Sequence, residues 1–192
     1  GLGDVYKRQM YDDYVYYVAK TKGFGKIVTS ASHLYAKMLA STASAITGPS
    51  PKVSEYFKAC GVKKPVHVIP NSVELDVFKP ENVDRNDAVR MRRKFGFADD
   101  DMVFCFCGRL GKEKNITLLL EYWAKNVRPE DKIKLFILGD GPLHEQHCKE
   151  ADELGISDMV KFAGRVEHPD LPVYYACCDA YITASLLSLI HI

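Results

Sequence analysis

Two basic residues, Arg109 and Lys114, stand five positions apart immediately after an apolar run that ends in glycine. The run Val103–Cys107 is apolar or aromatic throughout, as expected of a strand that is covered on both faces of a parallel sheet. Gly108 permits a sharp turn at the carboxyl end of this strand, which is where open α/β sheets bind ligands. A guanidinium, an ammonium and the positive end of the next helix together suit an anion such as a diphosphate. Taken alone, the segment also fits a solvated strand–helix turn.

A regular alternation of strand and helix patterns is expected to position this pair. Hydrophobic periodicity predicts strands at 102–107, 133–138, 160–162 and 180–183, and helices at 87–95, 115–126, 142–154 and 171–177. Such alternation predicts βαβ units and a parallel sheet, and therefore an α/β fold. Upstream, helices are predicted at 10–20, 32–43 and 51–60, and short strands at 45–47 and 66–69.

A polar stretch with a proline, residues 80–86, is predicted to link two α/β pieces, residues 10–79 and residues 87–186. Residues 1–9 show no apolar period, and residues 187–192 follow a predicted strand without turn chemistry. Both ends therefore look foreign to the natural chain. We expect residues 10–186 to be an internal fragment of a longer protein.

The composition excludes several classes of protein. The 192 residues carry 26 Lys and Arg against 25 Asp and Glu, a formal charge of +1, so no basic excess points to nucleic acid. No apolar run approaches the roughly 20 residues that a transmembrane helix needs, and no secretory signal opens the chain. The six cysteines form no Cys-x-x-Cys pair and no disulfide framework. We therefore expect buried free thiols and a cytoplasmic protein.

Several segments follow one another in an order that is more specific than any one of them. They are Val68–Pro80, Gly108–Leu110, Lys112–Asn115, Phe136–Pro142, Val160–Gly164 and Ala180–Ser185. This order resembles the retaining glycosyltransferases of family four, the glycosyl transferases group 1, which have the GT-B fold of two Rossmann-like domains facing across a cleft. The resemblance implies the end of an acceptor domain up to Lys79 and the first half of a nucleotide-sugar domain from Asp87.

The resemblance also gives the basic pair a role. Arg109 and Lys114 would hold the diphosphate of a nucleotide-sugar donor and stabilise negative charge as the sugar–phosphate bond breaks. This electrostatic role implies catalysis without a metal or another cofactor. Gly108 would keep the backbone close to the sugar phosphate.

Other residues are assigned to donor binding or to the junction between the domains by the same match. Gly139 and Gly141 match the glycine turn after the second strand. The loop that typically meets the nucleobase is matched by Gly164, Arg165 and Val166. The domain junction is matched by Asn71 and Ser72, and many relatives have a glycine in place of this serine.

The implied donor is a UDP-hexose such as UDP-glucose. The stretch Tyr11–Ser50 is most similar to bacterial enzymes that glucosylate diacylglycerol, so the expected acceptor is a lipid, with a saccharide as the alternative. The tyrosines and lysines between Tyr11 and Lys26 could form an aromatic–basic surface for anionic lipid heads at the inner face of the membrane. Tyrosine packing within a helix pair explains the same residues.

The sequence also departs from the family pattern. Leu186–Leu189 stands where relatives carry a pair of glutamates spaced by seven residues, and neither carboxylate is present. Arg8 and Gln9 stand where an acceptor-domain histidine is expected. We therefore expect the fragment to be inactive by itself. Two other functions stay open: a UDP-sugar epimerase of the same fold and a non-catalytic sugar-nucleotide-binding protein.

Two further patterns suggest metal binding, and both have a simpler explanation. Asp99, Asp100 and Asp101 include an Asp-x-Asp spacing but precede a strand, which favours a solvated turn. His144 and His147 lack the His-Glu-x-x-His spacing, which favours an exposed helix face. No metal site is predicted.

Overall fold

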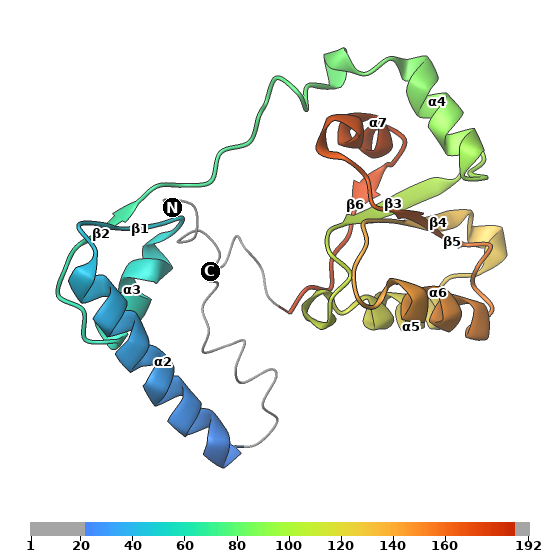
Figure 1. Cartoon of the computed structure of the whole chain (residues 1–192). Helices are drawn as coiled ribbons and strands as arrows, with labels where there is room; N and C mark the ends of the chain where they lie inside the picture. Colours follow the sequence, from blue (N-terminus) through green and yellow to red (C-terminus); the bar gives the residue numbers. More distant parts are fainter. Residues whose placement is uncertain (1–21, 187–192) are drawn as a thin grey trace. The chain divides into compact units, whose positions relative to one another are not determined.

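The computed structural model describes residues 22–186, which belong to two units that divide after Val73 (Figure 1). The predicted helix at 10–20, the tyrosines that precede Lys22 and both foreign-looking ends lie outside the described residues. The division precedes the predicted linker. Residues 80–86 instead contain the 3-10 helix η2 (Pro80–Asn82) and the start of α4 (Arg85–Lys94). The boundary expected at Lys79 therefore lies inside the second unit.

The first unit contains two short parallel strands connected by a helix. Strands β1 (Ile46–Gly48) and β2 (Val66–Val68) pair with each other, and α3 (Pro51–Ala59) lies between them in the chain. Pro51 suits the first turn of α3, where a backbone N–H is not needed. Gly61 follows the helix with a left-handed φ of 75°, the conformation that a helix end commonly requires.

The helix α2 (Lys22–Thr42) is longer than the sequence predicted, since its start lies well before residue 32. Gly23 and Gly25 lie in the additional turns, although intrinsic propensity disfavours glycine in a helix. At the other end, the ammonium of Lys64 donates to the carbonyl groups of Ala40 (3.1 Å) and Ala43. It thereby satisfies carbonyls that the end of a helix leaves unpaired.

The second unit is built on a parallel sheet with the strand order β5-β4-β3-β6. The inner strands β3 (Met102–Cys107) and β4 (Ile133–Leu138) coincide with the predicted ones. Of the outer strands, β5 (Val160–Gly164) extends further than predicted and β6 (Ala180–Tyr181) ends earlier. The predicted α/β class with a parallel sheet is confirmed.

Helices cover both faces of this sheet (Figure 1). On one face, α5 (Ile116–Asn126) and α6 (His144–Glu153) pack over Leu135 and Ile137. On the other face, α4 and α7 (Leu171–Ala176) pack over Phe136 and Leu138. Successive side chains of a strand point to opposite faces, and all four of these residues are fully buried. A continuous apolar run is what such a doubly covered strand requires.

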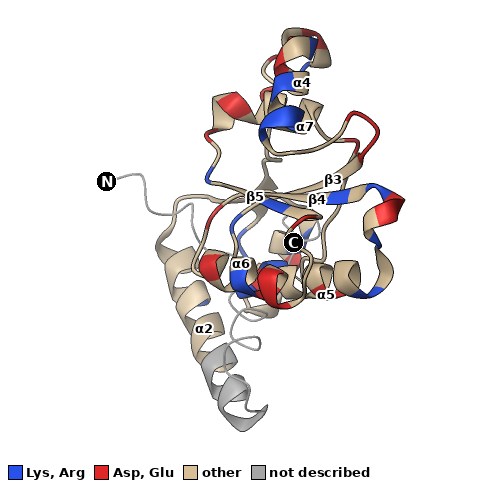
Figure 2. Cartoon of the chain, turned by 90° about the vertical axis from the view of Figure 1, so that its right-hand side faces the viewer, with Lys and Arg blue, Asp and Glu red and all other residues tan. Residues whose placement is uncertain are grey.

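Charged residues of both signs are interspersed along the outer helices of the second unit, notably α4 and α6 (Figure 2). This mixture is typical of a solvated helix surface. All six cysteines are free, as predicted. Cys60, Cys105 and Cys177 are buried, and the other three are half-buried. Between residues 22 and 186, no helix is both long and apolar enough to cross a bilayer.

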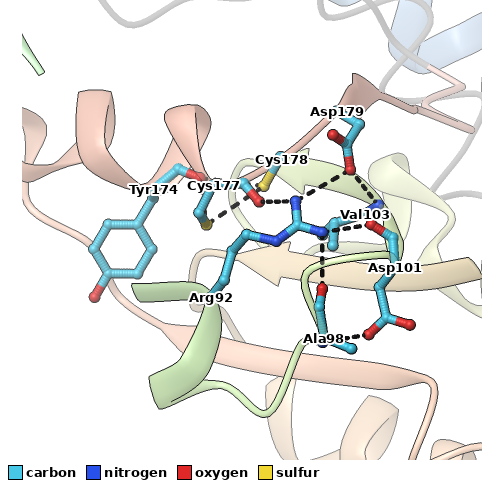
Figure 3. Close-up of polar contacts among 8 residues, drawn as sticks. All are labelled: Arg92, Ala98, Asp101, Val103, Tyr174, Cys177, Cys178 and Asp179. Atoms are coloured by element: carbon cyan, nitrogen blue, oxygen red, sulfur yellow. Dashed lines mark hydrogen bonds and ion pairs between the residues drawn. The ribbon is translucent and has the colours of Figure 1, made fainter. Parts of the chain in front are cut away.

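Arg92 fastens α4 to the beginning of β3 and the beginning of β6 (Figure 3). Its guanidinium donates to the carboxylate of Asp179 (3.3 Å), which in turn accepts from the N–H of Val103 (2.7 Å). Its two Nη atoms also donate to three backbone carbonyls. These belong to Ala98, Asp101 and Cys177. One side chain thus ties together three segments that are distant in the sequence.

Candidate functional site

The loop after β3 lies at the point of the sheet where the order of the strands reverses. From β3 the chain moves to β4 and then to β5 on one side, and it returns to β6 on the other side of β3. The direction in which the strand order runs therefore reverses between β3 and β6. At such a switch point, the carboxyl edge of an open α/β sheet binds ligands.

The loop after β3 is held from within by Leu110. Its side chain is fully buried in the core beneath α5 and α6. Its N–H donates to the carbonyl of Asp140 (3.0 Å), and its carbonyl accepts from the N–H of Leu143 (3.2 Å). On the other side of Arg109, the N–H of Gly108 donates to a β4 carbonyl at 2.9 Å. The backbone is therefore bonded on both sides of Arg109.

Lys114 returns to the same loop through a short helix. The 3-10 helix η3 (Lys112–Lys114) turns the chain, and Asn115 adopts a left-handed φ of 53° before α5 starts. The Cε atom of Lys114 lies 3.9 Å from the point that a Cβ atom on Gly108 would occupy. The lysine side chain is therefore beside the end of β3, next to the residue that carries the arginine.

Neither cation has a partner within residues 22–186. Arg109 is exposed and Lys114 is half-buried, and the described structure gives neither side chain a hydrogen bond or an ion pair. The first turn of α5 follows at once, and its unpaired N–H groups carry partial positive charge. The arrangement can therefore hold an anion that bears more than one negative charge.

Gly139 and Gly141 act on this loop through the backbone. A Cβ atom on Gly139 would lie 2.0 Å from the carbonyl oxygen of Gly108, and one on Gly141 would lie 2.6 Å from that of Leu110. Non-bonded atoms do not approach so closely, so only glycine lets the loop after β4 lie against the loop after β3. The structure gives both glycines this packing role. Contact of Gly139 with a donor stays a prediction.

The loop after β5 is divided between surface and core. Gly164 has a left-handed φ of 69°, and its carbonyl accepts from the N–H of Gly139 (2.8 Å). Arg165 is exposed and donates to the carboxylate of Glu167 (2.8 Å), whereas Val166 packs against the core on the α4 and α7 side. The loops after β3, β4 and β5 are therefore linked by backbone hydrogen bonds along one edge of the sheet.

The segment after β6 reaches this edge through contacts that the sequence did not predict. The carbonyl of Glu113 accepts from the N–H of Leu186 (2.8 Å) and from the hydroxyl of Ser185 (3.4 Å). Lys114 is the next residue, so the chain after β6 bonds to η3 across the switch point. The small, polar composition of the residues after this strand was the only signal, and it specifies no partner.

A carboxylate on α6 holds the first turn of α5. The hydroxyl of Thr117 donates to Glu150 (2.9 Å), and the amide of Gln146 donates to the other oxygen of the same carboxylate (2.7 Å). Burial tends to raise the pKa of Glu150, but the hydrogen bonds from Gln146, His147 and Thr117 outweigh it and lower this pKa. Because Thr117 lies one turn from Lys114, the position of the basic loop depends in part on Glu150.

The prediction of an exposed histidine face on α6 was wrong for His147. Its side chain is only 2 % exposed, and its Nδ1 atom lies 3.1 Å from the Glu150 carboxylate. His144 is half-buried, with its ring 5.8 Å from that of Phe162 on β5. The same face of α6 carries buried Ala151, so this face turns toward the sheet and away from solvent.

The aspartates before β3 have structural partners. The carboxylate of Asp101 accepts from the N–H of Ala98 (2.7 Å) and the residue is buried, so the prediction of a solvated turn was wrong at Asp101. Asp100 pairs with Lys132, and this pairing lowers the pKa of Asp100. Throughout residues 22–186, no cluster of three metal-ligating side chains occurs.

Asn71 and Ser72 are exposed residues of the first unit. They lie in the segment from Ile69 to Glu74, which contains no helix and no strand. Their assignment to a domain junction stays a prediction.

The family model for glycosyl transferases group 1 matches residues 87–187. Among curated proteins, the chain is similar to the alpha-monoglucosyldiacylglycerol synthase of Streptococcus pneumoniae, with 30 % identity over 91 % of this chain and 39 % of that protein. It is also similar to a GDP-mannose-dependent alpha-(1-6)-phosphatidylinositol monomannoside mannosyltransferase of Mycolicibacterium smegmatis, with 28 % identity over 67 % of this chain and 32 % of that protein. The chain thus spans well under half the length of these relatives.

Solved structures show the same fold. HepE of Anabaena, crystallised with UDP and glucose, matches with a TM-score of 0.68 at 23 % identity, over 81 % of this chain and 42 % of that one. WaaG, a glycosyltransferase of lipopolysaccharide biosynthesis, matches with a TM-score of 0.67 at 20 % identity, over 90 % of this chain and 48 % of that one. The arrangement of parallel strands and covering helices is therefore that of GT-B proteins.

Proposed function

The chain belongs to the glycosyl transferases group 1 family, and from this membership we propose that it is the donor-binding part of a retaining hexosyltransferase. The enzyme takes a hexose from a nucleotide-diphosphate sugar and passes it to an acceptor hydroxyl. The observation that carries the proposal is a pair of cations, Arg109 and Lys114, on one loop at the switch point of the sheet, with no partner among residues 22–186.

In this mechanism the two cations act on the leaving diphosphate. Arg109 presents a fork of N–H donors that matches phosphate oxygens, and Lys114 adds a compact positive charge. As the bond between sugar and phosphate breaks, negative charge grows on the diphosphate, and the two cations stabilise it without a metal ion. The N-terminal turn of α5 adds its own N–H donors. The acceptor hydroxyl attacks the sugar from the face that the diphosphate leaves.

We propose a UDP-hexose, with UDP-glucose first, as the donor. Two curated relatives are named alpha-monoglucosyldiacylglycerol synthases, and the HepE structure contains UDP and glucose. Other relatives are named as GDP-mannose-dependent enzymes, so the nucleotide must be tested directly. Gly164, Arg165 and Val166 are the residues proposed to meet the nucleobase.

We propose a lipid acceptor, with a saccharide as the alternative, and contact with the inner face of the membrane. The helix α2 contains no acidic residue, and it exposes Leu34 (70 %) and Met38 (56 %). An apolar surface on a helix without negative charge suits the surface of an anionic bilayer. The names of the relatives support this acceptor class, since both kinds of enzyme act on a glycerolipid or phosphoinositide.

The proposal is tested by replacing each cation in a full-length enzyme that contains this chain. We expect Arg109→Ala and Lys114→Ala each to lower turnover by about a hundredfold or more, as loss of one transition-state charge contact does. Release of UDP from UDP-glucose is measured with diacylglycerol and with a saccharide as acceptor. Lys112→Ala is the matched control, because Lys112 is an exposed lysine of the same η3 helix.

Unchanged turnover in both alanine variants would contradict the assignment. The same assay separates the other two functions. An epimerase would convert UDP-glucose to another UDP-sugar without any acceptor, and a non-catalytic protein would bind UDP-glucose without releasing UDP.

A further inference from the structure

The second unit begins at Glu74 with a segment that is held together by bonds of its own. The N–H of Val77 donates to the carbonyl of Glu74 (2.9 Å), and the ammonium of Lys79 pairs with Asp76 (2.6 Å). The amide of Asn82 also donates to the carbonyl of Asp76. The residues just before this segment are exposed and lie outside any helix or strand. Of these three bonds, the one from Asn82 connects the segment 74–79 to η2 of the second unit.

Phe78 is the side chain that attaches this segment to the body of the second unit. Its ring lies edge-on to that of His168, with centroids 5.2 Å apart, and 6.1 Å from that of Tyr175. His168 begins the 3-10 helix η5 (His168–Asp170), and Tyr175 belongs to α7. Phe78 is half-buried as a result.

Both partners of Phe78 lead directly to the donor loops. His168 comes two residues after Val166, in the same connection that starts at Gly164. Tyr175 contacts the thiol of Cys107, the last residue of β3 before Gly108. Burial of the Tyr175 hydroxyl, together with this contact, raises its pKa. One aromatic ring thus touches the elements that support two donor loops.

We propose that Phe78 is a positioning residue that holds η5 and α7, and through them the nucleobase loop and the β3 turn, in the arrangement that binds the donor. This inference rests on the proposed function. Without the ring, the two loops occupy the binding arrangement for a smaller fraction of the time, and the apparent affinity for the donor falls by that fraction. The cations themselves are untouched, so turnover of bound donor changes little.

The test uses Phe78→Ala in the full-length enzyme, with UDP affinity measured by calorimetry and KM and kcat measured for UDP-glucose. We expect the UDP dissociation constant and the donor KM to rise about three- to tenfold, in line with the strength of aromatic pairs, and kcat to stay within about twofold. Phe78→Tyr keeps the ring and should restore both values. Leu75→Ala is the control, because Leu75 lies in the same segment and is 71 % exposed.

A second readout needs no ligand. In the free protein, Phe78→Ala should speed amide hydrogen exchange at residues 107–111 and 164–166, and Leu75→Ala should not. If the alanine variant does not fold, Phe78→Leu replaces it, since leucine keeps the bulk and loses the aromatic edges. Unchanged UDP affinity and unchanged exchange at these loops would overturn the inference, even if the melting temperature falls. If the wild type binds no UDP while exchange responds as expected, the proposed function fails and the positioning by Phe78 stands.

Discussion

At the scale of single residues, the site depends on positions where no side chain fits. Gly141 lies so close to Leu110 that an added methyl group would sit 2.6 Å from a carbonyl oxygen, which is backbone and cannot rotate away. Gly155, in contrast, has a left-handed φ of 69° and nothing within 4 Å of its missing Cβ. Substitution of Gly141 therefore tests the close approach of two loops, and substitution of Gly155 tests the cost of a left-handed backbone alone.

We predict that Gly141→Ala displaces the loop that carries Arg109 and reduces UDP affinity, whereas Gly155→Ala leaves UDP affinity unchanged. Gly155→Ala should lower the free energy of unfolding by about 1 kcal/mol, the cost of a left-handed conformation for alanine. UDP binding by calorimetry and unfolding in urea measure the two effects. Equal UDP affinity in Gly141→Ala and wild type would show that the loop tolerates the added methyl group.

At the scale of elements, hydrogen bonds from the helix α4 hold it against the sheet. Arg92 of α4 is largely buried, with a side chain that is 14 % exposed, and it bonds to the carboxylate of Asp179 and to backbone carbonyls (Figure 3). Removing the guanidinium would take this donor from the carbonyls of the buried residues Asp101 and Cys177, whereas the carboxylate of Asp179 would keep the N–H of Val103. Losses of this kind are costly because each buried acceptor has already lost its water.

We expect Arg92→Ala to lower the free energy of unfolding by about 2 kcal/mol, the order of the cost of leaving buried acceptors without a donor. Arg90→Ala is the matched control on the same helix, because the Arg90 side chain is 71 % exposed and pairs with Asp87, which is itself 42 % exposed. An exposed pair of this kind contributes at most about 1 kcal/mol. Urea unfolding of both variants decides the matter, and equal losses would show that the buried bonds add nothing beyond a surface ion pair.

At the scale of the whole molecule, one part of the chain is a sheet covered on both faces and another is an exposed connection. The amides of β3 pair with strands on both sides, and helices cover both faces. Asn71, Ser72 and Val73 are exposed, and none of their backbone N–H groups has a hydrogen bond in the described structure. Opening of the sheet requires loss of the core, whereas the connection is open already.

We therefore predict that hydrogen exchange at Asn71, Ser72 and Val73 is about a thousandfold or more faster than at the amides of β3. Exchange followed by mass spectrometry after rapid digestion measures this difference. Comparable protection in the two segments would mean that another part of a longer protein covers the connection, or that the sheet opens locally.

Much of the second unit follows from local sequence. The apolar runs at Val103–Cys107 and Ile133–Leu138 predict doubly covered strands, and both strands occur at these residues. Glycine at the strand ends and the basic pair five positions apart predict an anion loop, because these are properties of neighbouring residues. The order of such segments along the chain also carried the resemblance that the family match confirms.

Tertiary structure decided what depends on residues far apart in the chain. The return of β6 to the far side of β3 makes the basic loop a switch point. The burial of His147, the bonds of Arg92 and the contact of Phe78 with α7 each need a partner that local patterns do not identify. A side chain's own sequence neighbours determine its turn or its strand. Which surface it meets is determined by packing, because apolar burial does not depend on distance along the chain.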